Sequence, residues 1–236
     1  ALEEIAAINA MGMEIIITDH HNPKEELPQA LAIINPKLPG AGYPYPHLAG
    51  VGVAFKLLMA IYQRLGIQNG ETTLKYMDLV AVGTIADIVP LTGENRLFAS
   101  IGLQHLIDKK NLGLNALVAI SGMNHKTLDT NDIVFGIAPR INAAGRMGSA
   151  ALAVELLISC EEAQSDELAE VIERQNSLRQ QLDQRTFHEA CDIIEKKYKD
   201  LANTPCMVIS SDDWHPGVIG IVASKLVEKY YRPVIM

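Results

Sequence analysis

Residues 161–199 restrict the fold of this chain most, because they contain neither proline nor glycine. Apolar residues recur through them at close to the helical period, and charged residues occupy much of the remainder. The pattern predicts a long amphipathic helix, with one break expected near Arg185 to Phe187. Such a length exceeds the usual range for a globular domain, so we expect this helix to connect two domains.

Predicted strands alternate with shorter helices on both sides of that segment. Runs rich in β-branched residues predict strands at residues 14–18, 31–35, 206–211 and 233–236. Helical spacing predicts helices at residues 2–11, 50–62, 72–88 and 217–230. Six prolines and glycines predict a loop at residues 36–47. Strands that alternate with helices are typical of an α/β fold with a parallel sheet.

The first predicted strand ends on a polar triplet. The apolar run from Ile15 to Thr18 stops at Asp19, His20 and His21. Open α/β sheets bind ligands outside the carboxyl ends of their strands, and carboxylates and imidazoles hold metals or carry protons. The triplet therefore favours a metal-dependent hydrolytic site, with Mn²⁺ or Mg²⁺ preferred over a structural Zn²⁺ because no cysteine is near. A solvated or capping histidine pair is the ordinary alternative.

Asp87 is a second isolated acid, with Ala86 and Ile88 on either side and Pro90 soon after. An unpaired carboxylate in an apolar setting would cost several kcal/mol, on the order of a buried charge. Asp87 therefore needs a partner. A helix cap and a metal ion are equally favoured by its position alone.

Composition limits the class of protein. A formal net charge of −8 argues against coating nucleic acid by bulk electrostatics, although a local phosphate-processing pocket remains compatible with it. Cys160, Cys191 and Cys206 are scattered, so we expect ordinary packed or partly exposed thiols. The sequence has no apolar run of membrane-spanning length and no signal-peptide pattern, so we expect a cytoplasmic protein without membrane contact.

Four segments then match a known family in order. They are Thr18–His21, Gly83–Leu91, Pro139–Arg146 and Trp214–Ser224. With them the chain resembles the RecJ family of the DHH phosphoesterase superfamily, which consists of single-strand DNA-specific 5′ to 3′ exonucleases. The resemblance implies a parallel-sheet DHH domain, a connecting helix and a smaller DHHA1-type α/β domain. We expect these at residues 1–158, 159–202 and 203–236, with the last one truncated.

The resemblance also assigns roles at the triplet. His20 and Asp87 are similar to metal ligands of the family, and Asp19 is similar to the residue that orients the first of them. His21 resembles the group that contacts the scissile phosphate or transfers a proton. Asp19 and His21 are therefore the expected catalytic residues. Mn²⁺ or Mg²⁺ in a two-metal site is the implied cofactor.

Two further motifs resemble substrate-binding segments. Arg140, Asn142 and Arg146 are similar to a phosphate-gripping motif, with surface salt bridges as the ordinary alternative. His215, Gly217 and Gly220 resemble a glycine-bearing motif before a helix whose free N–H groups can receive a phosphate. The ordinary alternative for these glycines is close packing at a turn.

The chain also departs from the family. RecJ-like proteins carry an Asp-x-Asp motif and another metal-binding aspartate upstream of the triplet, and neither occurs here. We therefore expect an internal fragment that is inactive alone. The resemblance implies that its parent degrades single-stranded DNA from the 5′ end in repair and recombination. Single-strand-binding protein and a helicase are the implied protein partners.

Two other functions remain open at this point. Oligonucleotide and cyclic-dinucleotide phosphodiesterases share the triplet, although the motifs at residues 139–146 and 214–224 speak against them. A non-catalytic replication or repair scaffold could keep the fold without the chemistry. Retention of the triplet together with Asp87 argues against a scaffold, because a scaffold has no use for an unpaired buried carboxylate.

Overall fold

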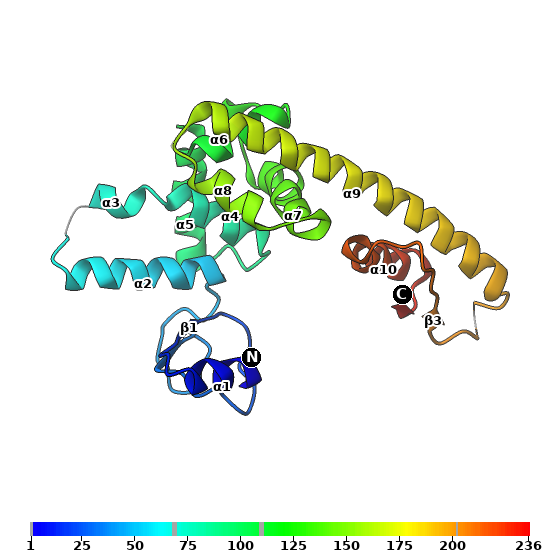
Figure 1. The fold of residues 1–236 in the computed structure, drawn as a ribbon, viewed down its shortest axis with the longest axis horizontal. Coiled ribbons are helices and arrows are strands. Elements are labelled where there is room, and N and C mark those ends of the chain that lie inside the picture. The colour runs from blue at the N-terminus through cyan, green and yellow to red at the C-terminus, as the bar shows by residue number, and fades with distance from the viewer. Residues whose placement is uncertain (1, 68–69, 109–110, 202) are drawn as a thin grey trace. The chain divides into compact units, whose positions relative to one another are not determined.

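The computed structural model describes residues 2–67, 70–108, 111–201 and 203–236. It is mostly helical, with short parallel strands, so the expected α/β class is confirmed. The chain forms two compact units (Figure 1). Unit 1 comprises the described residues of 1–111 and 123–135, and unit 2 comprises those of 112–122 and 136–236.

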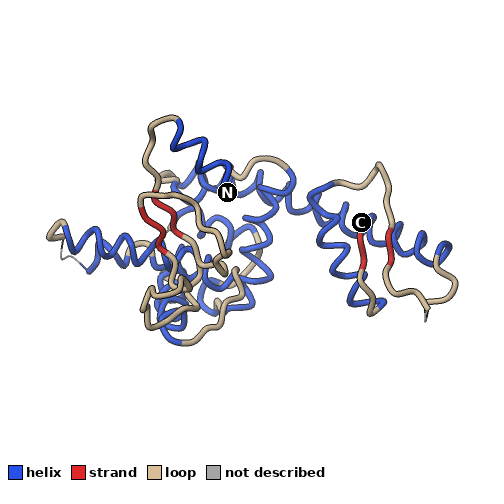
Figure 2. Tube along the Cα trace, turned by 90° about the horizontal axis from the view of Figure 1, so that it is seen from below, coloured by secondary structure: helices blue, strands red, loops and turns tan. Residues whose placement is uncertain are grey.

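One of the two strand pairs drawn in red in Figure 2 lies in unit 1. Strand β1 (Ile16–Thr18) pairs in parallel with β2 (Ala32–Ile34), and Ile16 lies opposite Ala32. Both strands were predicted, with bounds one or two residues wider. Helix α1 (Leu2–Ala10) precedes them, and the predicted loop at residues 36–47 follows without a helix or strand.

The remaining helices of unit 1 surround an apolar core. They are α2 (Gly50–Arg64), α3 (Gly70–Leu74), α4 (Met77–Ala86), α5 (Gly93–Ile107) and the short 3-10 helix η1 (His125–Thr127). Buried Leu48, Val53, Phe55, Val80 and Phe98 pack together between them. Helix α5 approaches α4 closely because Gly102 lies against the backbone of Met77, where a side chain would collide.

The single helix predicted at residues 72–88 is wrong in two respects. The chain breaks between α3 and α4, and Oδ1 of Asp78 in the first turn of α4 accepts a hydrogen bond of 2.7 Å from the N–H of Leu79. Such local side-chain bonds favour a helix start over a continuing helix. Helix α4 also ends at Ala86, which leaves Ile88 outside it with a φ of 56°.

Unit 2 is built on the long helix α9 (Glu162–Lys197). The predicted break near Arg185 to Phe187 is wrong, because α9 is continuous over 36 residues. Thr186 is buried there, and Nε of Arg185 lies 2.7 Å from Oε1 of Glu189 one turn later. Both the burial and the ion pair favour unbroken helix at that point.

The other elements of unit 2 pack along α9. Helices α6 (Leu112–Ile120), α7 (Ala138–Met147), α8 (Ala151–Ile158) and α10 (Pro216–Tyr230) all contact it. Strands β3 (Met207–Val208) and β4 (Val234–Ile235) pair in parallel, shorter than predicted. A π-helix, η2 (Asp132–Ile137), leads into α7, whose Pro139 has no N–H to donate.

The cysteines are as the sequence analysis expected. Cys191 is buried in the core of unit 2, Cys206 is half-buried and Cys160 is exposed, and all three are free thiols. Within the described ranges, each helix is either too short or too polar to cross a membrane.

Candidate metal centre

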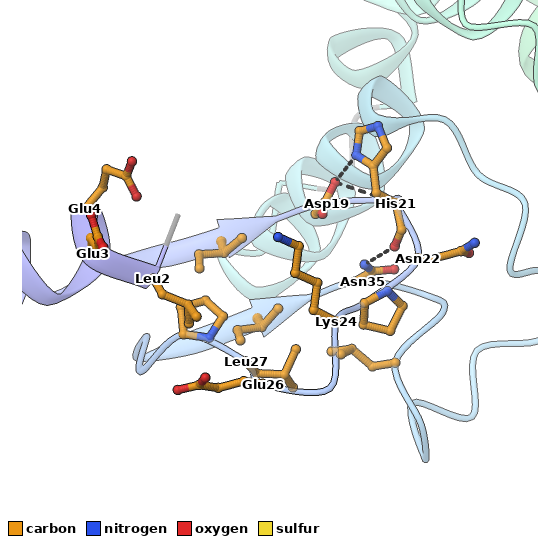
Figure 3. Close-up of a pocket in the computed structure, with 15 residues that line it drawn as sticks. Leu2, Glu3, Glu4, Asp19, His21, Asn22, Lys24, Glu26, Leu27 and Asn35 are labelled. Atoms are coloured by element: carbon orange, nitrogen blue, oxygen red, sulfur yellow. Dashed lines mark hydrogen bonds and ion pairs between the residues drawn. The ribbon is translucent and has the colours of Figure 1, made fainter. Parts of the chain in front are cut away.

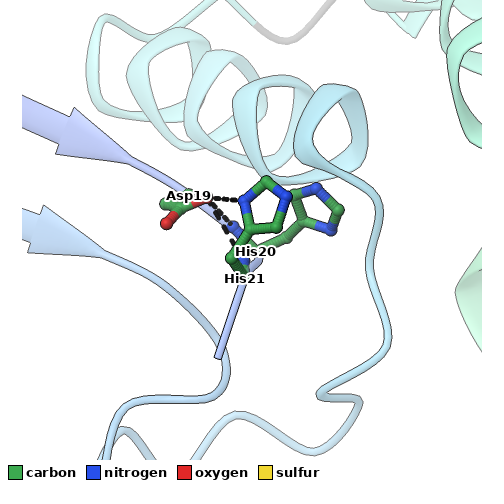
Figure 4. Close-up of side chains that lie close together, drawn as sticks. All are labelled: Asp19, His20 and His21. Carbon is green, nitrogen blue, oxygen red and sulfur yellow. Dashed lines mark hydrogen bonds and ion pairs between the residues drawn. The ribbon is translucent and has the colours of Figure 1, made fainter. Parts of the chain in front are cut away.

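The end of β1 gathers three potential ligands. One atom each of Asp19, His20 and His21 lies within 4.8 Å of the others (Figure 4). The N–H of Asp19 donates to the carbonyl of Ile34 at 3.0 Å, so β2 holds the backbone up to the first residue of the triplet. One carboxylate oxygen and two imidazole nitrogens form a mixed donor set, which fits Mn²⁺ better than an all-oxygen Mg²⁺ site.

Asp19 folds the triplet into a compact turn. Its Oδ1 accepts hydrogen bonds from the backbone N–H groups of His20 at 2.7 Å and His21 at 3.2 Å. The same oxygen lies 2.7 Å from Nδ1 of His21. Partial burial raises the pKa of Asp19, but these contacts outweigh it, and the pKa is lowered overall. Asp19 therefore carries its negative charge at neutral pH.

His20 is the most enclosed member of the triplet. Its side chain is 15% exposed, and Gly50 at the start of α2 lies so close that a Cβ there would stand 3.2 Å from Cδ2 of the ring. Nδ1 of His20 lies 3.4 Å from Oδ2 of Asp87. The structure thus brings Asp87 to the triplet, as the sequence analysis required.

The expected setting of Asp87 is wrong. It is the C-cap residue of α4, and its side chain is 38% exposed, so it is no buried carboxylate. The buried acid of this helix is Asp78, which is 0% exposed. Burial raises the pKa of Asp78, and the hydrogen bond from the N–H of Leu79 and the nearby His105 offset the rise only in part. Met77 and Leu79 give Asp78 the same apolar flanks as Asp87, so that signal existed and was missed.

Asn35 contacts the triplet, and the sequence analysis did not identify it. It follows β2, is 6% exposed, and donates from Nδ2 to the carbonyl of His21 at 2.9 Å. Its Oδ1 accepts from the N–H of Lys37 at 2.9 Å. The Asn35–Pro36 pair behind a strand was the available signal, since asparagine before proline favours a turn. Asn35 fixes the backbone of the triplet to β2.

A cavity adjoins the triplet. Its volume is about 470 Å³, and Asp19, His21, Lys24 and Asn35 contribute to its wall (Figure 3). Ile17 and Ile33 from the two strands supply apolar wall. The candidate centre therefore opens onto a space of mixed character, whose other ionisable wall residues are Glu3, Glu4 and Glu26.

The arginines predicted for phosphate binding differ in their surroundings. Arg140 on α7 is 14% exposed, and its Nε lies 2.5 Å from Oε2 of Glu173 on α9. Its Nη1 donates to the carbonyl of Gly136 at 2.8 Å. Arg140 is therefore ion-paired, but the pair is mostly buried and is not the surface salt bridge of the ordinary alternative. Asn142 and Arg146, on the same helix, are exposed.

The glycine-bearing motif meets Arg146 within unit 2. Nη1 of Arg146 donates to the carbonyl of Gly217 at 3.2 Å, and Nδ1 of His215 accepts from the N–H of Gly217 at 3.0 Å as the cap of α10. A side chain at Gly217 would collide with the carbonyl oxygen of Arg146. Gly220 is exposed, and a Cβ there would meet nothing within 4 Å. Close packing explains Gly217 but does not explain Gly220.

Known proteins resemble this chain over its full length. Residues 1–84 match the model of the DHH family, N-terminal domain. The single-stranded-DNA-specific exonuclease RecJ of Bacillus subtilis is 43% identical over 236 residues, which is all of this chain and 29% of the relative. The enzyme of the same name from Haemophilus influenzae is 38% identical over all of this chain and 42% of its own length.

A solved structure agrees with these relatives. RecJ from Thermus thermophilus in complex with Mn²⁺ superposes with a TM-score of 0.84 at 35% identity. The match covers 99% of this chain and 34% of that one. The chain therefore spans less than half the length of the curated relatives it matches.

Proposed function

We propose that the protein containing this chain, whose residues 1–84 match the DHH family model and which RecJ enzymes resemble over its full length, removes nucleotides from the 5′ end of single-stranded DNA by metal-dependent hydrolysis. The observation that supports this most is the approach of Asp87 to His20 beside the other two residues of the triplet. Two distant segments of the sequence supply this set of ligands.

We assign the cation to His20 and Asp87, with Asp19 as the residue that orients His20. The donor set suits Mn²⁺ or Mg²⁺, with further ligands needed for a second ion. A cation held there would lower the pKa of a bound water and offset the charge on the phosphate oxygens. Gly50 and Asp87 hold the ring of His20 from two sides. Pre-set ligands of this kind cost little reorganisation on binding.

His21 is the member of the triplet that we assign to the substrate. Its side chain is 77% exposed, and Nδ1 is engaged by Asp19. Nε2 is therefore the atom left to contact the scissile phosphate or to pass a proton to the departing oxygen. Asn35 sets the position of His21 by donating a hydrogen bond to the backbone carbonyl of His21.

In unit 2 we assign substrate contacts to residues of the two motifs. Arg146 and Asn142 on α7 offer a guanidinium and an amide, and His215 offers Nε2, because its Nδ1 caps α10. Gly220 allows a DNA backbone to come close to α10. Gly217 keeps His215 near Arg146. Arg140 would contribute through Nη2, since Glu173 and Gly136 engage its other two nitrogens.

We also propose a domain organisation and protein partners. We retain a DHH domain at residues 1–158, a connecting segment at 159–202 and a second domain from 203 onward. The protein would act in the cytoplasm on single strands exposed by a helicase, and it would meet single-strand-binding protein there. Co-purification with either protein is the direct check on these partners.

The deciding experiment uses the purified full-length protein. We expect it to shorten a 5′-phosphorylated, 3′-labelled single strand with Mn²⁺ or Mg²⁺, and to leave duplex DNA and cyclic dinucleotides intact. His20→Ala should abolish the reaction, whereas His188→Ala should not, because His188 is exposed on α9 and its Nδ1 contacts the carbonyl of Gln184 one turn earlier. An intact single strand with either metal would overturn the proposal.

A further inference from the structure

The residue after Asp87 has an unusual backbone. Among the described residues, Ile88 and Tyr231 are the only ones other than glycine with a positive φ, at 56° and 51°. A β-branched residue in the left-handed region is a true outlier, because its side chain crowds the neighbouring carbonyl. Ile88 is therefore the more strained of the two.

Two other helices of this chain end without such strain. Helices α2 and α6 are followed by Gly66 and Gly122, each with a φ of 71°. Glycine adopts this conformation freely and is the usual residue at such a position. Ile88 occupies the equivalent position after α4, where its N–H donates to the carbonyl of Ile85 at 3.2 Å. Glycine at position 88 would therefore end the helix with less backbone strain than isoleucine does.

Packing does not offset the strain at Ile88. The residue is 81% exposed, so its side chain gains little from burial. Its predecessor Asp87 lies 3.4 Å from His20 in the candidate metal centre. A strained, solvent-exposed aliphatic side chain therefore stands one residue away from that centre. Strain of this kind persists mainly where function requires it.

We propose that Ile88 contacts the substrate, packing its side chain on the face of the 5′-terminal nucleobase of single-stranded DNA. The inference rests on the proposed function of the same site. Unstacked bases expose apolar faces, and contact with those faces tolerates every sequence. A phosphate or a sugar hydroxyl would gain nothing from an aliphatic group. Ile88 thus binds the terminal nucleotide whatever its base.

The test substitutes Ile88→Asn in the full-length protein. Asparagine is similar in size, accepts the left-handed conformation and is polar. We expect the melting temperature to rise by a few degrees from the relief of strain. We expect kcat/KM for single-stranded DNA to fall roughly tenfold through loss of the apolar contact. Tyr231→Asn is the matched control, since it relieves strain at the other outlier and should leave kcat/KM unchanged.

A substrate without its 5′-terminal base isolates the contact. The wild-type protein should process this abasic strand about tenfold more slowly, and Ile88→Asn should lose nothing further on it. The inference would be overturned if Ile88→Asn reduced kcat/KM on the abasic strand by as much as on the intact strand. It would also be overturned if the kcat/KM of the variant on the intact strand were within twofold of the wild-type value. Ile88→Gly repeats the test if the asparagine variant melts lower. A wild-type protein inactive on single strands refutes the proposed function, and this inference with it.

Discussion

Oδ2 of Asp87 lies 3.4 Å from Nδ1 of His20, which joins the end of α4 to the end of β1 within unit 1. Helix α2 makes the approach possible because it contacts both elements. Gly50 leaves room for the ring of His20, and Gly83 leaves room for Val51 between α2 and α4. The absence of a side chain at Gly50 and at Gly83 thus allows the close approach of Asp87 to His20.

Asp87→Asn should weaken Mn²⁺ binding at least tenfold, because the amide keeps the shape of the carboxylate and removes its charge. Stability should change little, since the side chain is 38% exposed. Isothermal calorimetry with Mn²⁺ on the full-length protein measures the affinity. Asp108→Asn is the control, because Asp108 is the C-cap of α5 as Asp87 is of α4. Equal losses in both variants would contradict a ligand role for Asp87.

The sequence was sufficient to find the triplet because its signal is local. An apolar run that stops on polar residues predicts both the strand and the place of its functional end. Asp78 and Asp87 show where local signals fail. Both acids have apolar neighbours in the sequence, yet only Asp78 is buried, because it lies within α4 near His105 of α5, whereas Asp87 caps the end of α4. That choice depends on tertiary packing, which flanking residues do not encode.

Asn35→Asp should destabilise unit 1 by about 1–3 kcal/mol. Aspartate can still accept from the N–H of Lys37, but it cannot donate to the carbonyl of His21. Urea unfolding measures the loss. Asn124→Asp is matched, because Oδ1 of Asn124 accepts from the N–H of Lys126 in the same way at an exposed site. If the two variants lose the same stability, Asn35 does not anchor the triplet.

Asp78→Asn should stabilise the protein at pH 7. Burial raises the pKa of Asp78, so folding favours its protonated form. The associated stability is fully present below the unfolded pKa of about 3.9 and is lost as pH rises through the folded pKa. We expect the variant to gain about 1 kcal/mol or more at pH 7, and to lose that advantage near pH 4. Urea unfolding at both pH values decides, and a variant less stable at pH 7 would contradict the burial argument.

Glu94→Gln should show the opposite trend. Burial raises the pKa of Glu94, but Lys56 at 2.8 Å and the hydroxyl of Tyr43 at 2.7 Å lower it overall. A depressed pKa adds stability above the unfolded value of about 4.3, and that stability is lost as pH falls through the folded pKa. The variant should cost at most about 1 kcal/mol at pH 7, since solvent partly screens the pair. Wild type and variant should converge in acid, as thermal melts at pH 3 and 7 can establish.

Longer-range structure explains the other errors of the sequence analysis. The predicted break in α9 falls where the helix buries polar residues, and Asp183 there pairs with Lys225 of α10 at 2.6 Å. A partner so far away in the sequence cannot be recognised from the residues around Asp183. No elements were predicted for residues 91–158, although the structure places α5 to α8 and η2 there. Pro139 interrupts the regular pattern at the start of α7, directly after the π-helix η2.

The two glycines of the second motif provide a paired prediction of opposite sign. Gly217→Ala should destabilise by about 1–3 kcal/mol, because the new Cβ collides with the carbonyl oxygen of Arg146 and α10 must shift. Gly220→Ala should stabilise by about 0.5–1 kcal/mol, since its Cβ meets open space inside a helix.

Thermal unfolding gives the sign of each change, and the exonuclease assay adds a second measurement. If Gly220 admits a DNA backbone, its alanine variant will melt higher and yet bind single strands more weakly, because a methyl group then stands where the phosphate approaches. Gly66→Ala cannot serve as the control, because the φ of Gly66 is positive. Ser224→Ala can, since Ser224 lies one turn after Gly220 on α10 and its hydroxyl donates to the carbonyl of Gly220. If the Gly220→Ala variant binds single strands as tightly as the wild type, Gly220 does not contact the DNA backbone.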